Sequence, residues 1–234
     1  MNEVKTIQTL AVDIGGSGIK VIVLDETGEP ITQRSRVETP EPAKPDPILK
    51  EIVSLAVEQG EFDRISVGFP GVVMDGVIKT AVNLDSDWIG FNLATVLSER
   101  LGKPVRVAND ADIQGLGTIE GKGVELVVTL GTGFGSALFV EGKLVPNLEM
   151  GHHPFRKKDT YEEQLGRAAL DDVGKKKWNK RLEKAIATLQ SLFNCDCIYL
   201  GGGNTKKIEF ELPTNVKIVP NVNGLLGGIA LWKE

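Results

Sequence analysis

The fold is decided by the stretch Leu10-Ala-Val-Asp-Ile-Gly-Gly-Ser-Gly-Ile-Lys20, in which glycines separate two apolar runs. Apolar runs on both sides of a glycine turn predict a β-hairpin, here with strands over 7–13 and 19–24. The turn is not a P-loop, because GxxxxGK[ST] is absent and a strand follows the glycines. Exposed backbone N–H groups in such a turn can form a nest for phosphate, although the glycines could also serve only the turn.

Two charged residues flank this turn. Asp13 ends the first apolar run, where a carboxylate could orient magnesium through water, as that ion usually binds. Lys20 lies in the second run and could reach a phosphate as a point charge. With the turn itself, the predicted phosphate and donor residues at this place are Asp13, Gly15, Gly16, Ser17, Gly18 and Lys20.

A second glycine turn occurs in Leu130-Gly-Thr-Gly-Phe-Gly-Ser-Ala137, again between apolar runs. The repetition predicts two similar halves, each offering backbone amides to one phosphate chain. A third cluster, Tyr199-Leu-Gly-Gly-Gly-Asn204, follows a short apolar run and suits close backbone approach to a bulky ligand. These turns add the predicted donor residues Gly131, Thr132, Gly133, Gly201, Gly202, Gly203 and Asn204.

Between the two hairpins lies Val107-Ala-Asn-Asp-Ala-Asp112. The run from Pro104 to Ala108 predicts a buried strand, and the polar pair Asn109–Asp110 predicts a helix start directly after it. Ligands of open α/β sheets bind at the ends of such strands. Asp110 could there take the proton of a sugar hydroxyl, and Asn109 could bind a neighbouring hydroxyl. The alternative is plain helix capping.

The remaining pattern is typical of an α/β protein. Apolar stripes at helical spacing predict helices over 47–59 and 92–101, with Trp88 before the second of them either stacking on a sugar or lying buried. Further elements are predicted as strands over 31–36, 64–68 and 196–200, and as helices over 160–173, 175–193 and from about 222.

Composition limits the class of protein. A chain of 234 residues with 41% hydrophobic content can bury one large or two small cores. The net charge of −5 does not favour nucleic-acid binding, and no apolar run is long enough for a membrane helix. Cys195 and Cys197 are too close in sequence for a normal disulfide and are predicted to be reduced, which favours the cytosol.

Taken together, the motifs resemble those of the ROK family (repressor, open reading frame, kinase) of the actin-like ATPase superfamily, and most of all its polyphosphate glucokinase branch. The similarity runs in family order over nearly the whole chain, through DIGGSGIK (13–20), GFPGVV (68–73), NLDSDW (83–88), VANDAD (107–112), TLGTGFGSALF (129–139), LVPNLEMGHHPF (144–155), YEEQLGRAAL (161–170) and GGGN (201–204).

The resemblance implies an actin-like ATPase (ribonuclease H-like) fold of two similar α/β domains with a cleft between them. We expect an N-terminal domain over 1–109 and a C-terminal domain over 110–221. The terminal helix, 222–234, is expected to return to the first domain as it does in actin-like relatives.

The resemblance also implies roles for single residues. Asp110 matches the catalytic base and Asn109 a sugar ligand, while Asn83 falls in the segment that closes over the sugar. Glu149 and His152, in an E-x-G-H pattern, match residues that hold sugar hydroxyls. Glu162 matches a glutamate near the anomeric end of the sugar, although it could be an ordinary acidic residue of a first helical turn.

One departure from most of the family concerns metal. The interval from Gly151 to Glu162 lacks the cysteines of the family's CxCGxxGCxE zinc site. His152 and His153 alone make a poor metal site, so four tetrahedral ligands are not available nearby. We therefore expect no structural zinc, which is itself a feature of the polyphosphate glucokinase branch, and magnesium as the working ion.

The implied activity is phosphorylation of glucose at its 6-hydroxyl, with inorganic polyphosphate preferred to ATP as the donor, in a homodimer. Six basic residues between Lys175 and Lys184 agree with a polyanionic donor, or form only a solvated helix face. Two other classes fit less well. A sugar-sensing repressor needs a DNA-binding segment ahead of Leu10, and a structural ATPase does not need the sugar-binding set.

Overall fold

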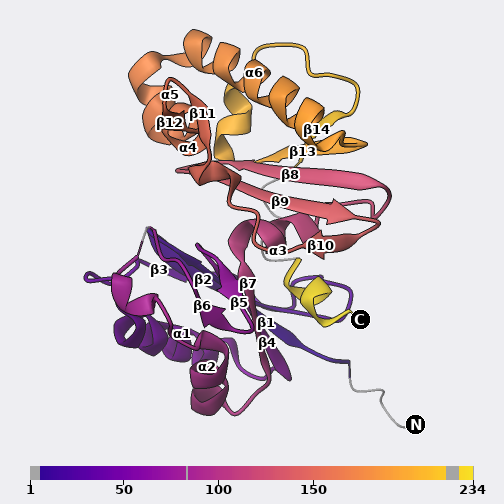
Figure 1. The fold of residues 1–234 in the computed structure, drawn as a ribbon. Helices are drawn as coiled ribbons and strands as arrows, with labels where there is room; N and C mark the ends of the chain where they lie inside the picture. Colours follow the sequence, from indigo (N-terminus) through magenta and orange to yellow (C-terminus); the bar gives the residue numbers. More distant parts are fainter. Residues whose placement is uncertain (1–5, 83, 220–226, 234) are drawn as a thin grey trace. The chain divides into compact units, whose positions relative to one another are not determined.

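The computed structural model describes residues 6–82, 84–219 and 227–233. The chain forms two compact units, Met1–Gly117 with Gly224–Glu234, and Thr118–Asn223. Each unit is built on its own five-stranded mixed sheet (Figure 1). No helix among the described residues is long and apolar enough to span a membrane.

The first unit has the strand order β3-β2-β1-β4-β7. β1 and β2 form the predicted hairpin, which β3 extends, while β4 and β7 run parallel to β1. Their bounds are Thr9–Gly15 (β1), Gly18–Leu24 (β2), Ser35–Val37 (β3), Arg64–Phe69 (β4) and Val105–Asn109 (β7). A short pair, Val73–Met74 (β5) with Val77–Ile78 (β6), and the 3-10 helix Ser86–Trp88 (η1) lie between β4 and β7 in sequence.

Alternate residues of β1 face two different layers, as the two-residue period of a strand requires. Leu10, Val12 and Ile14 belong to the larger core, which includes buried residues of α1 (Pro45–Gln59) and α2 (Leu93–Leu101). Ala11 packs instead with Ile229 of the C-terminal 3-10 helix η4 (Gly227–Trp232). The sheet of the first unit is therefore covered on both faces.

Hydrogen bonds and ring contacts fix η4 to the first sheet. The Ser66 hydroxyl on β4 donates to the Gly228 carbonyl at 2.6 Å and accepts from the Trp232 indole N–H at 2.8 Å. The guanidinium groups of Arg64 and Arg106 lie 5.0 and 4.6 Å from the centre of the Trp232 ring. The C-terminal segment is thus an integral layer of the first unit.

The second unit has the strand order β10-β9-β8-β13-β14. β8 and β9 form the second predicted hairpin, β10 extends it, and β13 is parallel to β8 and to β14. Both sheets therefore follow one plan, as the repeated glycine turns predict. The bounds are Val124–Leu130 (β8), Phe134–Val140 (β9), Lys143–Val145 (β10), Cys197–Gly201 (β13) and Val216–Ile218 (β14).

Helices and short elements complete the second unit (Figure 1). Trp178 of α6 is fully buried in its core, and its indole N–H donates to the Leu165 carbonyl of α4 at 2.9 Å. The elements of this unit are Tyr161–Leu165 (α4), Arg167–Val173 (α5), Lys175–Phe193 (α6), Met150–His152 (η2), Gly203–Lys207 (η3), Pro154–Arg156 (β11) and Asp159–Thr160 (β12). The remaining helix, Asp110–Leu116 (α3), belongs to the first unit.

The structure corrects several predicted elements. The run 104–108 is not a buried strand: β7 is the edge strand of its sheet, and its residues are partly or fully exposed. The predicted strand 31–36 overlaps the observed strand β3, Ser35–Val37, only at residues 35 and 36. The predicted helix 160–173 is two helices, because the backbone leaves the helical region at Gly166. The predicted start of the terminal helix near 222 lies outside the described residues, and its described part is the 3-10 helix η4.

Candidate functional site

Asn109 and Asp110 lie at the carboxyl end of β7, where α3 begins. Asn109 caps the helix, since its side-chain oxygen accepts from Ala111 N at 2.8 Å and its amide group donates to the Gly71 carbonyl at 3.1 Å. Asp110 occupies the first helical position and is exposed, with one carboxylate oxygen 2.8 Å from Ala111 N. The capping role that the sequence left open is therefore real for Asn109, and Asp110 presents an accessible carboxylate.

The turn of the first glycine hairpin lies at the same end of the sheet, where β1, β4 and β7 have their carboxyl ends. β4 lies between β1 and β7, and Asp13 pairs with Gly68, which in turn pairs with Ala108. The Lys20 ammonium lies 2.7 Å from the Asp13 carboxylate across the hairpin. The parallel strands of the first unit thus bring their carboxyl ends together at one end of the sheet. At this end lie Asp13, Lys20, the turn from Gly15 to Gly18, and the Asn109–Asp110 pair.

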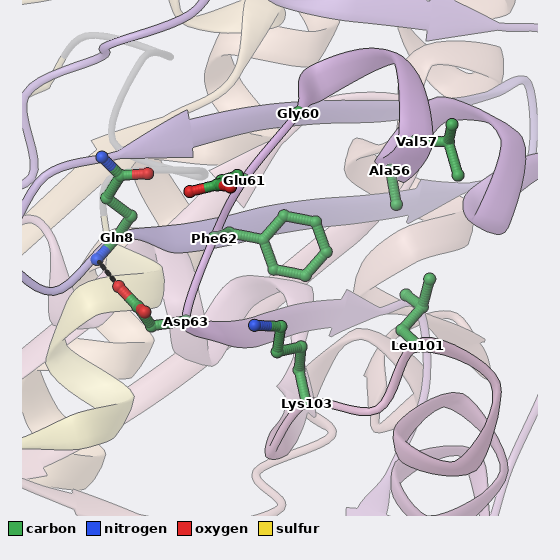
Figure 2. Close-up of a pocket in the computed structure, with 9 residues that line it drawn as sticks. All are labelled: Gln8, Ala56, Val57, Gly60, Glu61, Phe62, Asp63, Leu101 and Lys103. Carbon is green, nitrogen blue, oxygen red and sulfur yellow. Dashed lines mark hydrogen bonds between the residues drawn. The ribbon is translucent and has the colours of Figure 1, made fainter.

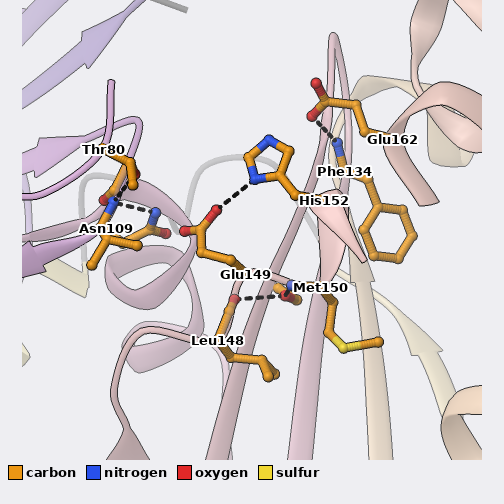
Figure 3. Close-up of polar contacts among 11 residues, drawn as sticks. Thr80, Asn109, Phe134, Leu148, Glu149, Met150, His152 and Glu162 are labelled. Carbon is orange, nitrogen blue, oxygen red and sulfur yellow. Dashed lines mark hydrogen bonds and ion pairs between the residues drawn. The ribbon is translucent and has the colours of Figure 1, made fainter. Parts of the chain in front are cut away.

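The second glycine turn is held by Glu162. Its carboxylate accepts from Phe134 N at 3.1 Å, which fixes the end of the turn (Figure 3). A Cβ atom added to Gly133 would lie 2.2 Å from the same carboxylate, so a side chain at this position would displace the Glu162 carboxylate from the turn. The Thr132 carbonyl accepts from Arg167 N at 3.0 Å, where α5 begins. The role of Phe134 N and Arg167 N was not predicted from the sequence.

The third glycine cluster lies against the second. The Asn204 amide group donates to the Gly131 carbonyl at 2.8 Å, and a Cβ atom on Gly202 would lie 2.3 Å from the Leu130 carbonyl oxygen. Gly202 also has a φ of 91°, a left-handed conformation that glycine adopts without strain. The parallel strands β8 and β13 therefore bring 131–133 and 201–204 together, as the predicted donor-binding role of both loops requires.

Glu149 and His152 form a close pair in the second unit. The His152 Nδ1 atom lies 3.1 Å from the Glu149 carboxylate (Figure 3). Partial burial is the largest influence on the pKa of Glu149 and raises it; His152 opposes this shift, and the negative charge of Glu162 adds to it. The second unit thus brings three predicted sugar-binding residues into electrostatic contact.

Ser136 on β9 positions the Glu149 segment and was not predicted from the sequence. Its buried hydroxyl donates to the Leu148 carbonyl at 2.9 Å and accepts from Met150 N at 3.2 Å. These two bonds hold the backbone on both sides of Glu149. The sequence signal was a single hydroxyl within an otherwise apolar strand.

Three further predictions concern single residues and metals. Asn83 lies outside the described residues. Trp88 is fully buried, and its indole N–H donates to the Ala43 carbonyl at 2.9 Å, so it offers no stacking surface for a sugar. Cys195 and Cys197 are both free thiols. Within 6–82, 84–219 and 227–233, no group of three or more His, Cys, Asp and Glu side chains is placed to hold a metal ion.

A pocket of about 460 Å³ lies elsewhere in the first unit (Figure 2). Its lining residues Gln8, Asp63 and Lys103 precede β1, β4 and β7, whereas the candidate residues of the first unit lie at or just beyond the carboxyl ends of these parallel strands. The pocket therefore lies at the amino ends of these strands, at the opposite end of the sheet from the candidate residues, and is separate from the candidate site.

Comparison with known proteins agrees with these motifs. Residues 9–166 match the family model described as "ROK family". A polyphosphate glucokinase from Mycobacterium tuberculosis (strain CDC 1551 / Oshkosh) is 34% identical over 92% of this chain and 88% of its own length. A polyphosphate glucokinase from Mycobacterium leprae (strain TN) is also 34% identical, over 94% of this chain and 70% of its own.

Solved structures give the same result. The inorganic polyphosphate/ATP-glucomannokinase from Arthrobacter sp. strain KM has a TM-score of 0.86 and 33% identity, covering 96% of this chain and 99% of that one. A ROK family glucokinase from Streptomyces griseus, solved with glucose and AMPPNP, has a TM-score of 0.80 at 22% identity, covering 96% and 98%. The predicted resemblance and the predicted actin-like fold are confirmed.

The contacts of Glu149 predict opposite pKa shifts for two substitutions. His152→Ala should raise the pKa of Glu149 further, because it removes the group that stabilises the carboxylate. Glu162→Gln should lower it, because it removes a like charge. Carbon-13 NMR titration of the glutamate carboxyl groups measures both changes.

Glu163 serves as the internal reference in the same spectra. Its pKa is lowered by its capping-box hydrogen bonds with Thr160, which neither substitution touches. If both variants shift the pKa of Glu149 in the same direction while the pKa of Glu163 is unchanged, the electrostatic description of the Glu149–His152 pair is wrong.

Proposed function

Because this chain belongs to the ROK family, we propose that it transfers the terminal phosphoryl group of inorganic polyphosphate to the 6-hydroxyl of glucose. The products are glucose 6-phosphate and a polyphosphate shorter by one unit. The observation that carries this assignment is 34% identity to polyphosphate glucokinases over most of both chains. The similarity to a polyphosphate/ATP-glucomannokinase, at 33% identity, supports the same class of donor and acceptor.

Phosphoryl transfer requires little covalent chemistry from the protein, which must align the reactants and balance charge. In the proposed reaction the 6-oxygen of glucose forms a bond to the terminal phosphorus. The bond from that phosphorus to the bridging oxygen breaks, and the proton of the 6-hydroxyl passes to the carboxylate of Asp110. The exposed carboxylate at the start of α3 is suited to this role, because it is accessible and lies at the end of a strand.

The sugar ligands follow from the family resemblance. We propose that Asn109, Glu149, His152 and Glu162 bind glucose hydroxyl groups, and that Asn83 belongs to the same set. Two of them have a second task in the protein, since Asn109 caps α3 and Glu162 holds Phe134 N. Their side chains are therefore already ordered before a sugar arrives, which lowers the entropy cost of binding.

The donor is proposed to bind along the glycine loops. Backbone N–H groups of Gly15–Gly18 and 131–133, with 201–204, suit phosphate oxygens. Magnesium, when bound, would neutralise part of the donor charge. A site with few protein ligands fits Asp13, since magnesium usually keeps several waters and takes its other oxygens from phosphates. The Lys20 ammonium lies 2.7 Å from the Asp13 carboxylate, so this lysine is placed to bind the same phosphates as the magnesium ion.

Other parts of the proposal rest on the family resemblance or on composition. ATP is the alternative donor, because the ROK family glucokinase from Streptomyces griseus was crystallised with the ATP analogue AMPPNP. We propose a cytoplasmic homodimer without structural zinc that acts on a small sugar and binds neither nucleic acid nor membrane.

The donor assignment predicts that kcat/KM for long-chain polyphosphate exceeds kcat/KM for ATP, with glucose as the acceptor. A coupled assay of glucose 6-phosphate with each donor in turn measures the two values. A higher value for ATP would instead identify an ATP-dependent glucokinase of the same family.

The base assignment predicts that Asp110→Asn lowers kcat by about 10²–10⁴-fold, the usual effect of losing a general base, while glucose binding is largely kept. The amide retains an oxygen that can accept from Ala111 N, so the helix start is preserved. Asp46→Asn is the matched control, because Asp46 is an exposed aspartate in the first turn of α1. Turnover of Asp110→Asn equal to that of the control would exclude Asp110 as the base.

The metal assignment predicts that chelator-treated protein stays folded, is inactive, and recovers when magnesium is added. Circular dichroism, elemental analysis and the coupled assay follow the three properties together. Stoichiometric zinc whose removal unfolds the chain would contradict the interpretation of residues 151–162.

A further inference from the structure

Helix α6 concentrates positive charge in a chain of net charge −5. It contains six basic residues and one acidic residue, Glu183. Lys176 and Lys180 are both exposed and share one face of the helix at i,i+4 spacing. Among the described residues, neither lysine has a carboxylate partner, so their charges face solvent.

A second pair of lysines follows the third glycine loop. Lys206 and Lys207 are the last two residues of the 3-10 helix η3, which also contains Asn204, and both are exposed. Because the Asn204 amide group donates to the Gly131 carbonyl at 2.8 Å, the start of η3 is fixed to the second glycine turn. These two lysines are thus only a few residues from the proposed donor loops.

Asn179 joins the two pairs. Its buried amide group donates to the Lys175 and Lys207 carbonyls, each at 2.9 Å, and its oxygen accepts from Glu209 N at 2.8 Å. The Lys175 ammonium also pairs with the Glu209 carboxylate. The segment after η3 is therefore held against the first turns of α6, and the nearby Glu209 is already paired.

We propose that Lys206, Lys207, Lys176 and Lys180 form a lysine track that binds the distal part of a long polyphosphate chain. The chain would leave the loop at Gly201–Asn204, pass η3 and continue along α6. This proposal rests on the proposed function, because it requires polyphosphate as the donor. It adds a binding surface outside the glycine loops.

Charge complementarity selects this occupant. Every internal phosphate of the polymer carries negative charge, and lysines can bind it while releasing its counterions, an attraction that weakens steeply with salt. A short donor would end within the glycine loops and would not reach α6. The track therefore predicts a preference for long chains, which a solvated helix face would not produce.

The test compares long-chain polyphosphate with tripolyphosphate in the wild type and in two double variants, Lys206→Glu with Lys207→Glu, and Lys176→Glu with Lys180→Glu. At low salt we expect the ratio of kcat/KM for the long chain to kcat/KM for tripolyphosphate to fall by about tenfold or more in each. The difference between variants and wild type should shrink at high salt, because screening weakens exposed charges.

The matched control is Lys122→Glu with Lys143→Glu. Both lysines are exposed residues of the second unit, and they lie near the start of β8, at the opposite end of the sheet from the glycine loops. The same change in net charge at this place should leave the ratio at its wild-type value. Equal ratios in wild type, track variants and control would overturn the proposal, as would an equal fall in all three double variants.

Failure of the proposed function is a separate outcome. If the wild type uses ATP but not polyphosphate, calorimetric titration with long-chain polyphosphate decides whether the track exists. Binding that the track variants lose and the control keeps would support it, and absence of binding would refute it. Competition by single-stranded DNA as strong as that by long-chain polyphosphate would show a general polyanion surface and overturn the assignment.

Discussion

The parallel pairing of strands is the constraint on which the candidate site depends. In the first unit, β1, β4 and β7 run in one direction, so Asp13 and the Asn109–Asp110 pair reach the same edge although almost a hundred residues separate them. In the second unit, the parallel strands β8 and β13 bring the glycine loops 131–133 and 201–204 to one end of their sheet. The loops can then approach closely only because glycine leaves the space, as at Gly202 beside the Leu130 carbonyl.

Local sequence patterns predicted most of the sheet. A glycine turn between apolar runs is a short-range signal, and both hairpins occur where it predicts them. The burial of β7 could not be predicted in this way, since an apolar run does not show whether a strand lies inside a sheet or at its edge. The packing of η4 on Ser66 is a contact between distant residues and carries no local signal.

The candidate site shows a similar division. The residue types at 109–110 and 149–152 indicate polar chemistry, but the roles proposed for them in glucose binding come from the family resemblance. What sequence alone did not reveal is how the protein holds these residues. Ser136 fixes the backbone around Glu149, and Glu162 supports a glycine turn through Phe134 N. Such supporting contacts depend on tertiary packing and are visible only in the folded chain.

The return of the C-terminal segment to the first sheet has a consequence for the order of folding during synthesis. Residues 118–223 of the second unit form one continuous stretch, whereas the first unit needs Ile229 and Trp232 to cover its second face. Domains generally fold as units while the chain emerges, with the N-terminal one first. Here the N-terminal unit completes its packing last, so on the ribosome the apolar face around Ala11 stays open until the second unit has been made.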